Sequence, residues 1–339
     1  MAGLSAEENA KAWSGRRVLV TGVGGFIGSH VAETLVQAGA SVRAFVRYVS
    51  RGDYGWLETS PPEILEELEI FRGDLANPEA VVNAVAGREI VLHLGALVPI
   101  PYSYRHPREF VTANLEGTLN VLEAVRREEI ARIVHISTSE VYGTAMRVPI
   151  DEEHPLHPQS PYAATKVGAD QLALSYQRSF GTPVVILRPF NTYGPRQSAR
   201  AVIPTIIAQA LSREEIKLGA TSPTRDFLYV ADTVQGLLRC ATAEGIEGET
   251  INLGTGVEVS IGDLAQRILR LLGVEVPIAL DEGRLRPPNS EVERLVADVS
   301  KAKRLLAWQP EVTLDEGLRR TIEWLTGSLS SYKTSVYNI

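Results

Sequence analysis

The stretch VLVTGVGGFIGSH, residues 18–30, constrains the fold of this chain more than any other. An apolar run leads into three glycines, Gly22, Gly25 and Gly28, and a helical pattern follows them. Glycines at such a strand-to-helix turn let backbone N–H groups approach a pyrophosphate, and the helix N-terminus adds partial positive charge. The alternative is a tight turn without a ligand. Because the turn opens a strand–helix–strand unit, we expect a dinucleotide-binding fold.

Apolar strands and helical patterns alternate through the first 190 residues. Strands are predicted at 16–22, 41–47, 69–75, 89–96, 132–139 and 183–190, with helices at 24–39, 78–85, 109–128 and 162–181. Helices of this length between strands indicate right-handed crossovers and a parallel sheet. The pattern predicts an α/β fold with a Rossmann-type, doubly wound parallel sheet.

The alternation breaks down after Phe190. Segments 191–200, 222–230 and 281–298 are rich in loop residues and place arginines beside prolines or aromatic side chains. One more strand is predicted at 249–256, followed by helices at 260–273, 300–308 and 314–327. We therefore expect a dinucleotide-binding domain and a smaller, discontinuous α/β C-terminal domain for the substrate. The expected division is 14–190 plus about 230–256 for the first, about 191–229 plus 257–327 for the second, and a tail at 328–339.

Charge and composition bound the partners. The net charge of −7 argues against a general nucleic-acid binder. The apolar run IVLHLGALVPIP is too short to span a bilayer and is interrupted by proline, and residues 1–17 show no signal-peptide pattern. The single cysteine, Cys240, excludes an intrachain disulfide and suits a reducing compartment. We expect a cytoplasmic protein without a nucleic-acid or membrane partner, and we assign no metal-binding residues.

The second predicted strand bears on the choice of cofactor. An NAD site usually ends this strand in Asp or Glu, which binds the ribose 2′-hydroxyl. Here Val46 holds the acidic position, Arg47 follows, and Arg51 is near. This pattern favours NADP over NAD, although both arginines could be solvated surface residues. After the third strand, Asp74 could accept a hydrogen bond from the adenine amino group, or cap the next helix.

Two groups of polar side chains have the residue types needed for acid–base chemistry. Tyr162 and Lys166 are four residues apart on a predicted helix and so share a face. A lysine ammonium beside a tyrosine lowers the pKa of the phenol, which allows a tyrosinate to act as general base. Thr138, Ser139 and Glu140 follow the strand at 132–139, at the edge where open α/β sheets bind ligands. Each group has an ordinary alternative, a solvated helix face and a helix-capping or salt-bridged glutamate.

Together with HLGA (93–96), NLEGT (114–118), RPFNTYGPR (188–196) and TRDFLYV (224–230), these motifs resemble the extended short-chain dehydrogenase/reductases. Within them, the chain is similar to the nucleotide-sugar epimerase/dehydratase group over roughly residues 16–326. The resemblance implies bound NAD(P) and a nucleoside-diphosphate-sugar substrate. It also implies a homodimer that pairs through the helical patterns at 116–125 and 162–176.

The resemblance assigns roles to individual residues. It makes Thr138, Tyr162 and Lys166 catalytic and Asn114 a structural asparagine. The expected cofactor contacts are Gly22, Gly25, Phe26, Ile27, Gly28, Arg47, Asp74, Leu75, Leu94, Ala96, Tyr162 and Lys166. The expected substrate contacts are Asn191, Arg196, Arg225 and Arg286. Arg225 and Arg286 can each bind a phosphate in bidentate fashion, or form ordinary surface ion pairs.

Glu140 separates the reactions of this group. The resemblance implies that simple 4-epimerases lack an acid at this position, whereas 4,6-dehydratases carry Thr-Asp-Glu or Thr-Ser-Glu, and glucuronate decarboxylases carry Thr-Ser-Glu. In a dehydratase, the carboxylate removes the C5 proton after C4 is oxidised. Ser139 stands where some dehydratases have Asp to protonate the leaving hydroxyl. Either Glu140 returns the proton that it took, or a water supplies one.

We therefore expect a nucleotide-sugar 4,6-dehydratase that forms a 4-keto-6-deoxy sugar nucleotide. The segments IPYSYRHP (100–107) and RLRPPNSEVERL (284–295) resemble the nucleotide–N-acetylhexosamine 4,6-dehydratases of legionaminic-type acid synthesis, which implies an NDP-N-acetylhexosamine substrate. The alternatives are a 4-epimerase or a UDP-glucuronate decarboxylase, in which Arg105 could hold the C6 carboxylate. A non-catalytic NADP-sensing regulator is a third class, which the intact Thr138, Tyr162 and Lys166 disfavour.

Overall fold

The structure of the protein is a computed structural model that describes residues 11–212, 215–329 and 332. The predicted tail at 328–339 lies mostly outside the described residues. Within them, no helix is long and apolar enough to cross a membrane. Cys240 is a free, buried thiol.

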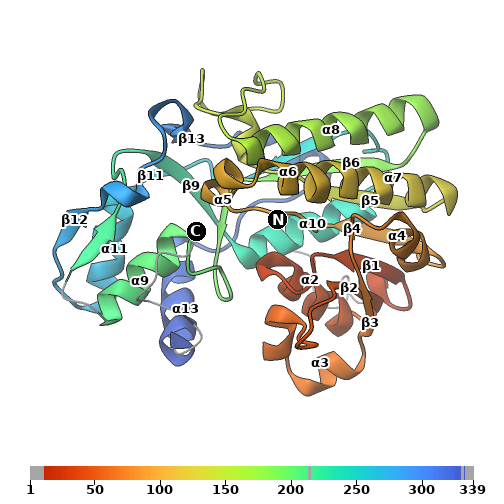
Figure 1. Cartoon of the computed structure of the whole chain (residues 1–339), viewed down its shortest axis with the longest axis horizontal. Coiled ribbons are helices and arrows are strands. Elements are labelled where there is room, and N and C mark those ends of the chain that lie inside the picture. The colour runs from red at the N-terminus through yellow and green to blue at the C-terminus, as the bar shows by residue number, and fades with distance from the viewer. Residues whose placement is uncertain (1–10, 213–214, 330–331, 333–339) are drawn as a thin grey trace.

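A seven-stranded sheet forms the centre of the molecule (Figure 1). Its order is β10-β6-β5-β4-β1-β2-β3, and every neighbouring pair is parallel. The bounds are β1 Arg17–Thr21, β2 Ser41–Arg47, β3 Glu69–Gly73, β4 Ile90–His93, β5 Arg132–Ile136, β6 Val184–Pro189 and β10 Thr250–Leu253. The strand order reverses between β1 and β4, which is where open α/β sheets bind their ligands. The predicted Rossmann-type sheet is confirmed.

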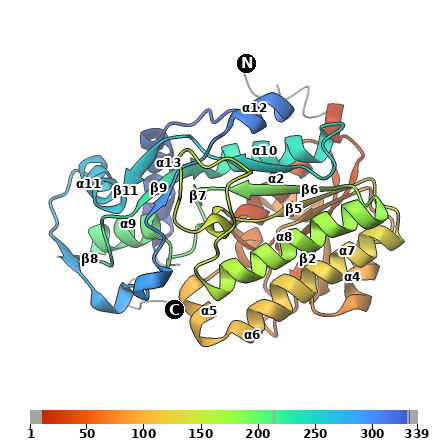
Figure 2. The same ribbon diagram turned by 90° about the horizontal axis from the view of Figure 1, so that it is seen from above.

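Helices cover both faces of this sheet. Figure 2 shows α4 (Pro78–Val85), α7 (Gly117–Arg127) and α8 (Pro161–Phe180) on one side, with α2 (Phe26–Gln37) and α10 (Val230–Thr242) on the other. Successive side chains of β1 alternate between the two layers, because a strand has a period of two. Val18 and Val20 pack in the apolar cluster of α2 and α10, whereas Leu19 packs under α4 and α7.

Local sequence signals set the ends of these helices. Asn77 caps α4 by accepting hydrogen bonds from the backbone N–H groups of Glu79 and Ala80. Ser160 caps α8, Pro161 begins it, and Gly181 ends it at a φ of +68°. The helix predicted at 109–128 is instead three stretches: α6 (Pro107–Phe110), a π-helical turn (Val111–Glu116) and α7. Asn114 lies in the π-helical turn and is buried. Its hydrogen bonds are described with the active site below.

The remaining elements form a smaller region at one end of the sheet. A four-stranded sheet contains β7 (Asn191–Tyr193), β9 (Thr224–Tyr229), β11 (Glu258–Ser260) and β13 (Arg294–Leu295), and a two-stranded one pairs β8 (Ile216–Leu218) with β12 (Ile278–Leu280). The helices here are α9 (Val202–Ser212), α11 (Ile261–Leu272) and α13 (Leu314–Gly327), whereas α12 (Ser300–Leu306) packs against β10 and α10 of the large sheet (Figure 2). The short helices elsewhere are Gly55–Thr59, α3 (Pro62–Glu66), α5 (Ile100–Arg105), Ser139–Tyr142, Glu282–Arg284 and Pro288–Ser290.

This region is more ordered than its loop-rich sequence predicts. Segment 222–230 was expected to be a loop but contains β9, whose residues 225–229 are all buried. A strand buried on both faces has no polar alternation to reveal it. Helices α9 and α10 were not predicted either. The division into two domains stays a prediction.

Candidate active site

The glycine-rich turn packs too closely for side chains. Gly22 has a φ of +69°, and a Cβ there would lie 2.7 Å from the backbone nitrogen of Gly95. A Cβ on Gly28 would lie 2.3 Å from the carbonyl oxygen of Gly22. Gly25 is the N-cap of α2, where no side chain caps the helix and the first turn contains no acid. The backbone N–H groups at this helix end, which belong to Phe26 and Ile27 among others, are therefore suited to an anion such as a pyrophosphate.

Several of the predicted cofactor contacts meet beside this turn. Leu94 and Ala96 flank Gly95, whose N–H donates to Thr21 Oγ1 at 3.0 Å at the end of β1. The side chain of Leu75 packs against Gly95 as well. The carboxyl ends of β1 and β4 thus form one surface with the glycine-rich turn.

The residues around β2 only partly match their predicted roles. Val46 is buried in the core at the end of β2, whereas Arg47 and Arg51 are exposed. Asp74 is exposed and accepts a hydrogen bond from Ala76 N at 2.8 Å. The alternative that Asp74 caps the following helix is wrong, because Asn77 does so.

A segment that the sequence analysis did not single out covers the glycine-rich turn. The backbone N–H of Trp56 donates to Gly24 O at 2.9 Å. A Cβ on Gly55 would lie 2.5 Å from the same oxygen. In the sequence, this segment is marked only by a glycine followed by a tryptophan after β2. That pair does not by itself predict a contact with the glycine-rich turn.

Two elements carry the proposed catalytic residues: the segment after β5 carries Thr138 and Glu140, and α8 carries Tyr162 and Lys166. Thr138 ends the β5 segment and accepts a hydrogen bond from Glu140 N at 3.2 Å, and Tyr162 and Lys166 lie on the first two turns of α8. Ser139 is buried, and the Glu140 side chain is 12% exposed.

The electrostatics of Tyr162 differ from the sequence prediction. Burial raises the pKa of the phenol above its ordinary value, and a hydrogen bond with Thr138 acts in the opposite direction. The ammonium of Lys166 donates to the carbonyl oxygen of Ile136 at 2.6 Å. Burial lowers the pKa of Lys166 to about 8.

Asn114 connects the end of β4 to α8. Its Oδ1 accepts from Leu97 N at 2.7 Å, and its Nδ2 donates to Leu97 O at 2.9 Å and to Thr165 Oγ1 at 3.1 Å. Thr165 in turn donates to the carbonyl oxygen of Tyr162 at 2.7 Å. The asparagine therefore fixes the loop at 94–97 relative to the helix that carries Tyr162 and Lys166.

Glu140 faces a cluster of charged side chains. Its Oε2 lies 3.8 Å from Arg286 Nη1, which is 3.9 Å from Glu291 Oε1. Arg225 Nη2 donates to the same Glu291 oxygen at 3.3 Å. Burial lowers the pKa of Arg225, and Glu140 acts against that shift. The structure thus brings Arg225 and Arg286 to the carboxylate of Glu140.

Two residues of this cluster were missed as site residues. Glu291 lies between the two arginines, and Tyr104, on α5, hydrogen-bonds to Ser290 at 2.6 Å. The charges of Glu140, Glu291 and Arg286 all act on the phenol of Tyr104. Both residues fall within the segments 100–107 and 284–295, so a resemblance pointed to them, but neither was assigned a role.

The other predicted substrate contacts lie in different surroundings. Asn191 begins β7, next to β9, and within the described residues its buried Oδ1 has no hydrogen-bond partner. Arg196 instead packs against α2, where its Nη2 donates to Glu33 Oε1 at 2.6 Å. Arg105 is exposed at the end of α5.

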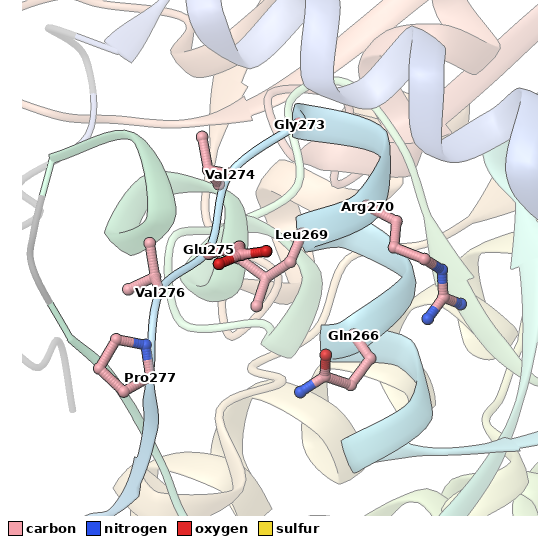
Figure 3. Close-up of a pocket in the computed structure, with 8 residues that line it drawn as sticks. All are labelled: Gln266, Leu269, Arg270, Gly273, Val274, Glu275, Val276 and Pro277. Carbon is pink, nitrogen blue, oxygen red and sulfur yellow. The ribbon is translucent and has the colours of Figure 1, made fainter.

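A separate pocket lies at the C-terminal end of α11 (Figure 3). It has a volume of about 710 Å³, and its lining residues lie between Gln266 and Pro277. None of the predicted site residues lines it. In the described residues, no group of three or more His, Cys, Asp or Glu side chains is placed to hold a metal.

Comparison with known proteins identifies the family. A family model described as GDP-mannose 4,6 dehydratase matches residues 19–321. The chain belongs to this family. A dTDP-glucose 4,6-dehydratase from Streptomyces niveus is 32% identical to this chain over 316 residues, which cover 91% of this chain and 92% of that protein.

Solved structures of both dehydratases and epimerases resemble this member of the family. An epimerase from Methanothermobacter thermautotrophicus has a TM-score of 0.86 at 28% identity, covering 96% of each chain. DesIV, a dTDP-glucose 4,6-dehydratase from Streptomyces venezuelae solved with NAD bound, has a TM-score of 0.83 at 29% identity, covering 94% of this chain and 99% of that one. The chain is therefore an enzyme of the nucleotide-sugar dehydratase/epimerase family.

Proposed function

We propose that the protein is an NAD(P)-dependent nucleotide-sugar 4,6-dehydratase. The observation that carries the proposal is the position of Glu140, a carboxylate at the end of the segment that also presents Thr138. Its charge acts on Tyr162 across the site. A simple epimerase needs the hydroxyl and the tyrosine but has no use for a second base.

The glycine-rich turn supports binding of the dinucleotide. Gly22 and Gly28 leave no room for side chains, and the uncapped N-terminus of α2 offers backbone N–H groups to the pyrophosphate. When bound, the oxidised nicotinamide supplies the hydride acceptor. DesIV, which resembles this chain over nearly its whole length, was solved with NAD.

Tyr162 takes the proton of the C4 hydroxyl in the first half of the reaction. Its hydrogen bond to Thr138 favours the phenolate, against the opposing effect of burial. Thr138 and Tyr162 thereby orient the C4 oxygen from two elements, and Asn114 holds α8 in place.

Glu140 performs the elimination. Oxidation at C4 makes the C5 proton acidic, and the Glu140 carboxylate removes it. The C6 hydroxyl then leaves as water, carrying the proton that Glu140 took from C5. Return of the hydride to C6 and uptake of a proton at C5 would complete the 4-keto-6-deoxy product. Ser139 is buried and has no acidic group, so the glutamate carries both proton transfers.

The arginines support binding of a sugar nucleotide. The guanidinium groups of Arg225 and Arg286 can each donate two hydrogen bonds to a diphosphate. The buried Oδ1 of Asn191, which has no hydrogen-bond partner within the described residues, can accept one from the nucleotide. Arg196 is a weaker candidate, since Glu33 already neutralises it.

The proposed sugar is an N-acetylhexosamine. Segments 100–107 and 284–295, which resemble the enzymes for this sugar class, meet at Glu140 through the hydrogen bond between Tyr104 and Ser290. Because these two segments are far apart in the sequence but adjacent in the site, they are suited to shape one sugar pocket together.

A panel of UDP-, GDP-, dTDP- and CDP-sugars, including N-acetylhexosamines, tests the proposal by product mass. Loss of water with an N-acetylhexosamine nucleotide is expected. Loss of CO2 from a glucuronate nucleotide would establish a decarboxylase, and an isomer of unchanged mass an epimerase. No turnover of any substrate would support a regulatory protein.

A further inference from the structure

Asp170 is a buried carboxylate on the same face of α8 as the proposed catalytic pair. It follows Lys166 by four residues, and Lys166 follows Tyr162 by four, so the three side chains share one side of the helix. Asp170 has no exposed surface. A charge in such a place needs specific partners, because burial without them is costly.

The partners of Asp170 join α8 to the two strands beneath it. Asp170 Oδ2 accepts hydrogen bonds from Ser137 Oγ at 2.9 Å, and from Nε and Nη2 of Arg188 at 3.0 and 2.9 Å. Ser137 directly precedes Thr138, and Arg188 lies on β6. The other oxygen, Oδ1, faces His135 Nε2 at 3.4 Å. One carboxylate therefore connects the tyrosine–lysine helix to the threonine segment.

The charged and titratable groups around Lys166 come from four elements. They are Tyr162 and Asp170 on α8, His93 on β4, His135 on β5 and, behind Asp170, Arg188 on β6. Both histidines are neutral near pH 7, because burial lowers the pKa of His135 to about 4 and that of His93 well below its ordinary value.

Asp170 is the negative charge of this group. Burial alone would raise its pKa, but His135, Arg188 and Lys166 together hold that pKa below its ordinary value. Among the described residues, it is the carboxylate whose charge acts on Lys166. Lys166 is 3% exposed, so burial lowers the pKa of its ammonium, and the charge of Asp170 acts against that shift.

We propose that Asp170 is a positioning residue of the active site, which fixes α8, the helix of Tyr162 and Lys166, to the segment that carries Thr138 and supplies a buried negative charge one helical turn from Lys166. This inference rests on the proposed dehydratase function, in which Tyr162 is the base and Lys166 is the catalytic lysine that the family resemblance implies. Asp170 does not contact the reacting atoms. It acts through the lysine and, by way of Ser137, on the segment that carries Thr138.

Direct titration of Lys166 tests the inference without a substrate. The lysine side chains are labelled with ¹³C, and the Lys166 signal is assigned by its loss in Lys166→Arg. In the native protein we expect a midpoint near pH 8. Asp170→Asn should lower it by about one pH unit or more, the usual effect of losing a nearby opposite charge. An unchanged midpoint in the folded variant would overturn the inference.

Ser137→Ala is the matched control. It removes one hydrogen bond to Asp170 but leaves the charge, so the Lys166 midpoint should stay in place. A shift as large as that of Asp170→Asn would show that hydrogen bonding, and not charge, controls the lysine, which contradicts the proposal.

A second variant keeps the test valid if Asp170→Asn does not fold. Asp170→Asn leaves the guanidinium of Arg188 without its counter-ion, which is strongly destabilising for a buried charge. Asp170→Asn combined with Arg188→Gln removes both charges, and thermal denaturation checks its folding. A downward shift of the Lys166 midpoint is still expected, smaller than in Asp170→Asn because the positive charge of Arg188 is lost as well, and the absence of any downward shift would refute the role of Asp170. If the native protein fails to dehydrate any sugar nucleotide, the proposed function fails, but the titration still decides this inference.

Discussion

Tyr104 and Ser290 lie 186 residues apart in the sequence and share a hydrogen bond of 2.6 Å. Ser290 also donates to the carbonyl oxygen of Gln159, whose amide nitrogen donates to the backbone at 289 and 291. The loop that carries Arg286 and Glu291 is thus fastened to α5 on one side and to the residues before α8 on the other.

Loss of the Tyr104 hydroxyl should weaken substrate binding. Tyr104→Phe removes the bond to Ser290, which is worth about 1 kcal/mol, so KM should rise about fivefold with little change in kcat. Tyr102→Phe is the matched control, since that hydroxyl bonds to Glu109 at 2.8 Å on the protein surface. Steady-state kinetics of both variants check this. An equal effect in both would show that the loop contact has no role in binding.

Arg47 should determine the choice between the two dinucleotides. It is exposed at the end of β2, where Val46 replaces the carboxylate that usually binds the ribose 2′-hydroxyl. We expect NADP to bind more tightly than NAD, and Arg47→Ala to reduce this preference about tenfold through the lost charge-assisted bond. Calorimetric titration with both dinucleotides measures the ratio.

Arg127→Ala, at an exposed position at the end of α7, is the control and should leave the ratio unchanged. DesIV was solved with NAD, whereas the NADP preference expected here rests on Arg47 and on the missing carboxylate at Val46. Tighter binding of NAD by the native protein would refute it.

Acid should destabilise the protein through His135. The unfolded chain binds this proton near pH 6.5, whereas the folded protein binds it only near pH 4, so unfolding takes up a proton between these values. Stability therefore falls as the pH drops from about 6.5 to about 4, by about 3 kcal/mol from this residue. Urea unfolding at pH 7 and pH 5 should show a smaller difference for His135→Gln than for the native protein.

His106→Gln serves as the control, because His106 is exposed near Glu109. Its variant should keep the native pH dependence. The same pH dependence in His135→Gln and the native protein would contradict a neutral, buried His135.

We propose a homodimer that pairs through α7 and α8. Both helices expose large apolar side chains, Leu119 at 36% and Phe180 at 55%. Light scattering at micromolar concentration should give twice the mass of the chain, and Leu119→Glu should give the monomer. Leu280→Glu changes an exposed leucine on β12 and should leave the dimer intact. A native monomer would contradict the proposal.

The sequence predicted the large sheet well, because its strands are continuous apolar runs that end at glycines or caps. Gly22, in the turn after β1, and Asn77, the N-cap of α4, each determine the backbone only a few residues away, so a short stretch of sequence reveals them. The arrangement around Glu140 was harder to predict, because it depends on contacts between distant segments. Nothing local to Glu291 shows that it lies between Arg225 and Arg286, and nothing local to Arg196 shows that Glu33 pairs with it. Burial also reversed the predicted effect on the Tyr162 phenol, since a pattern of side chains does not reveal desolvation.

Glu140→Gln tests the central claim most directly. The substitution keeps the size of the side chain but removes its basic oxygen, and loss of a general base typically costs ~10²–10⁴-fold in rate. With an accepted sugar nucleotide, the variant should still reduce its cofactor, seen as dihydronicotinamide absorbance. It should accumulate a 4-keto sugar that keeps its C6 hydroxyl, without exchange of the C5 hydrogen into deuterated solvent. Dehydration by the variant at near the native rate would contradict the account, leaving Glu140 a structural residue and favouring an epimerase.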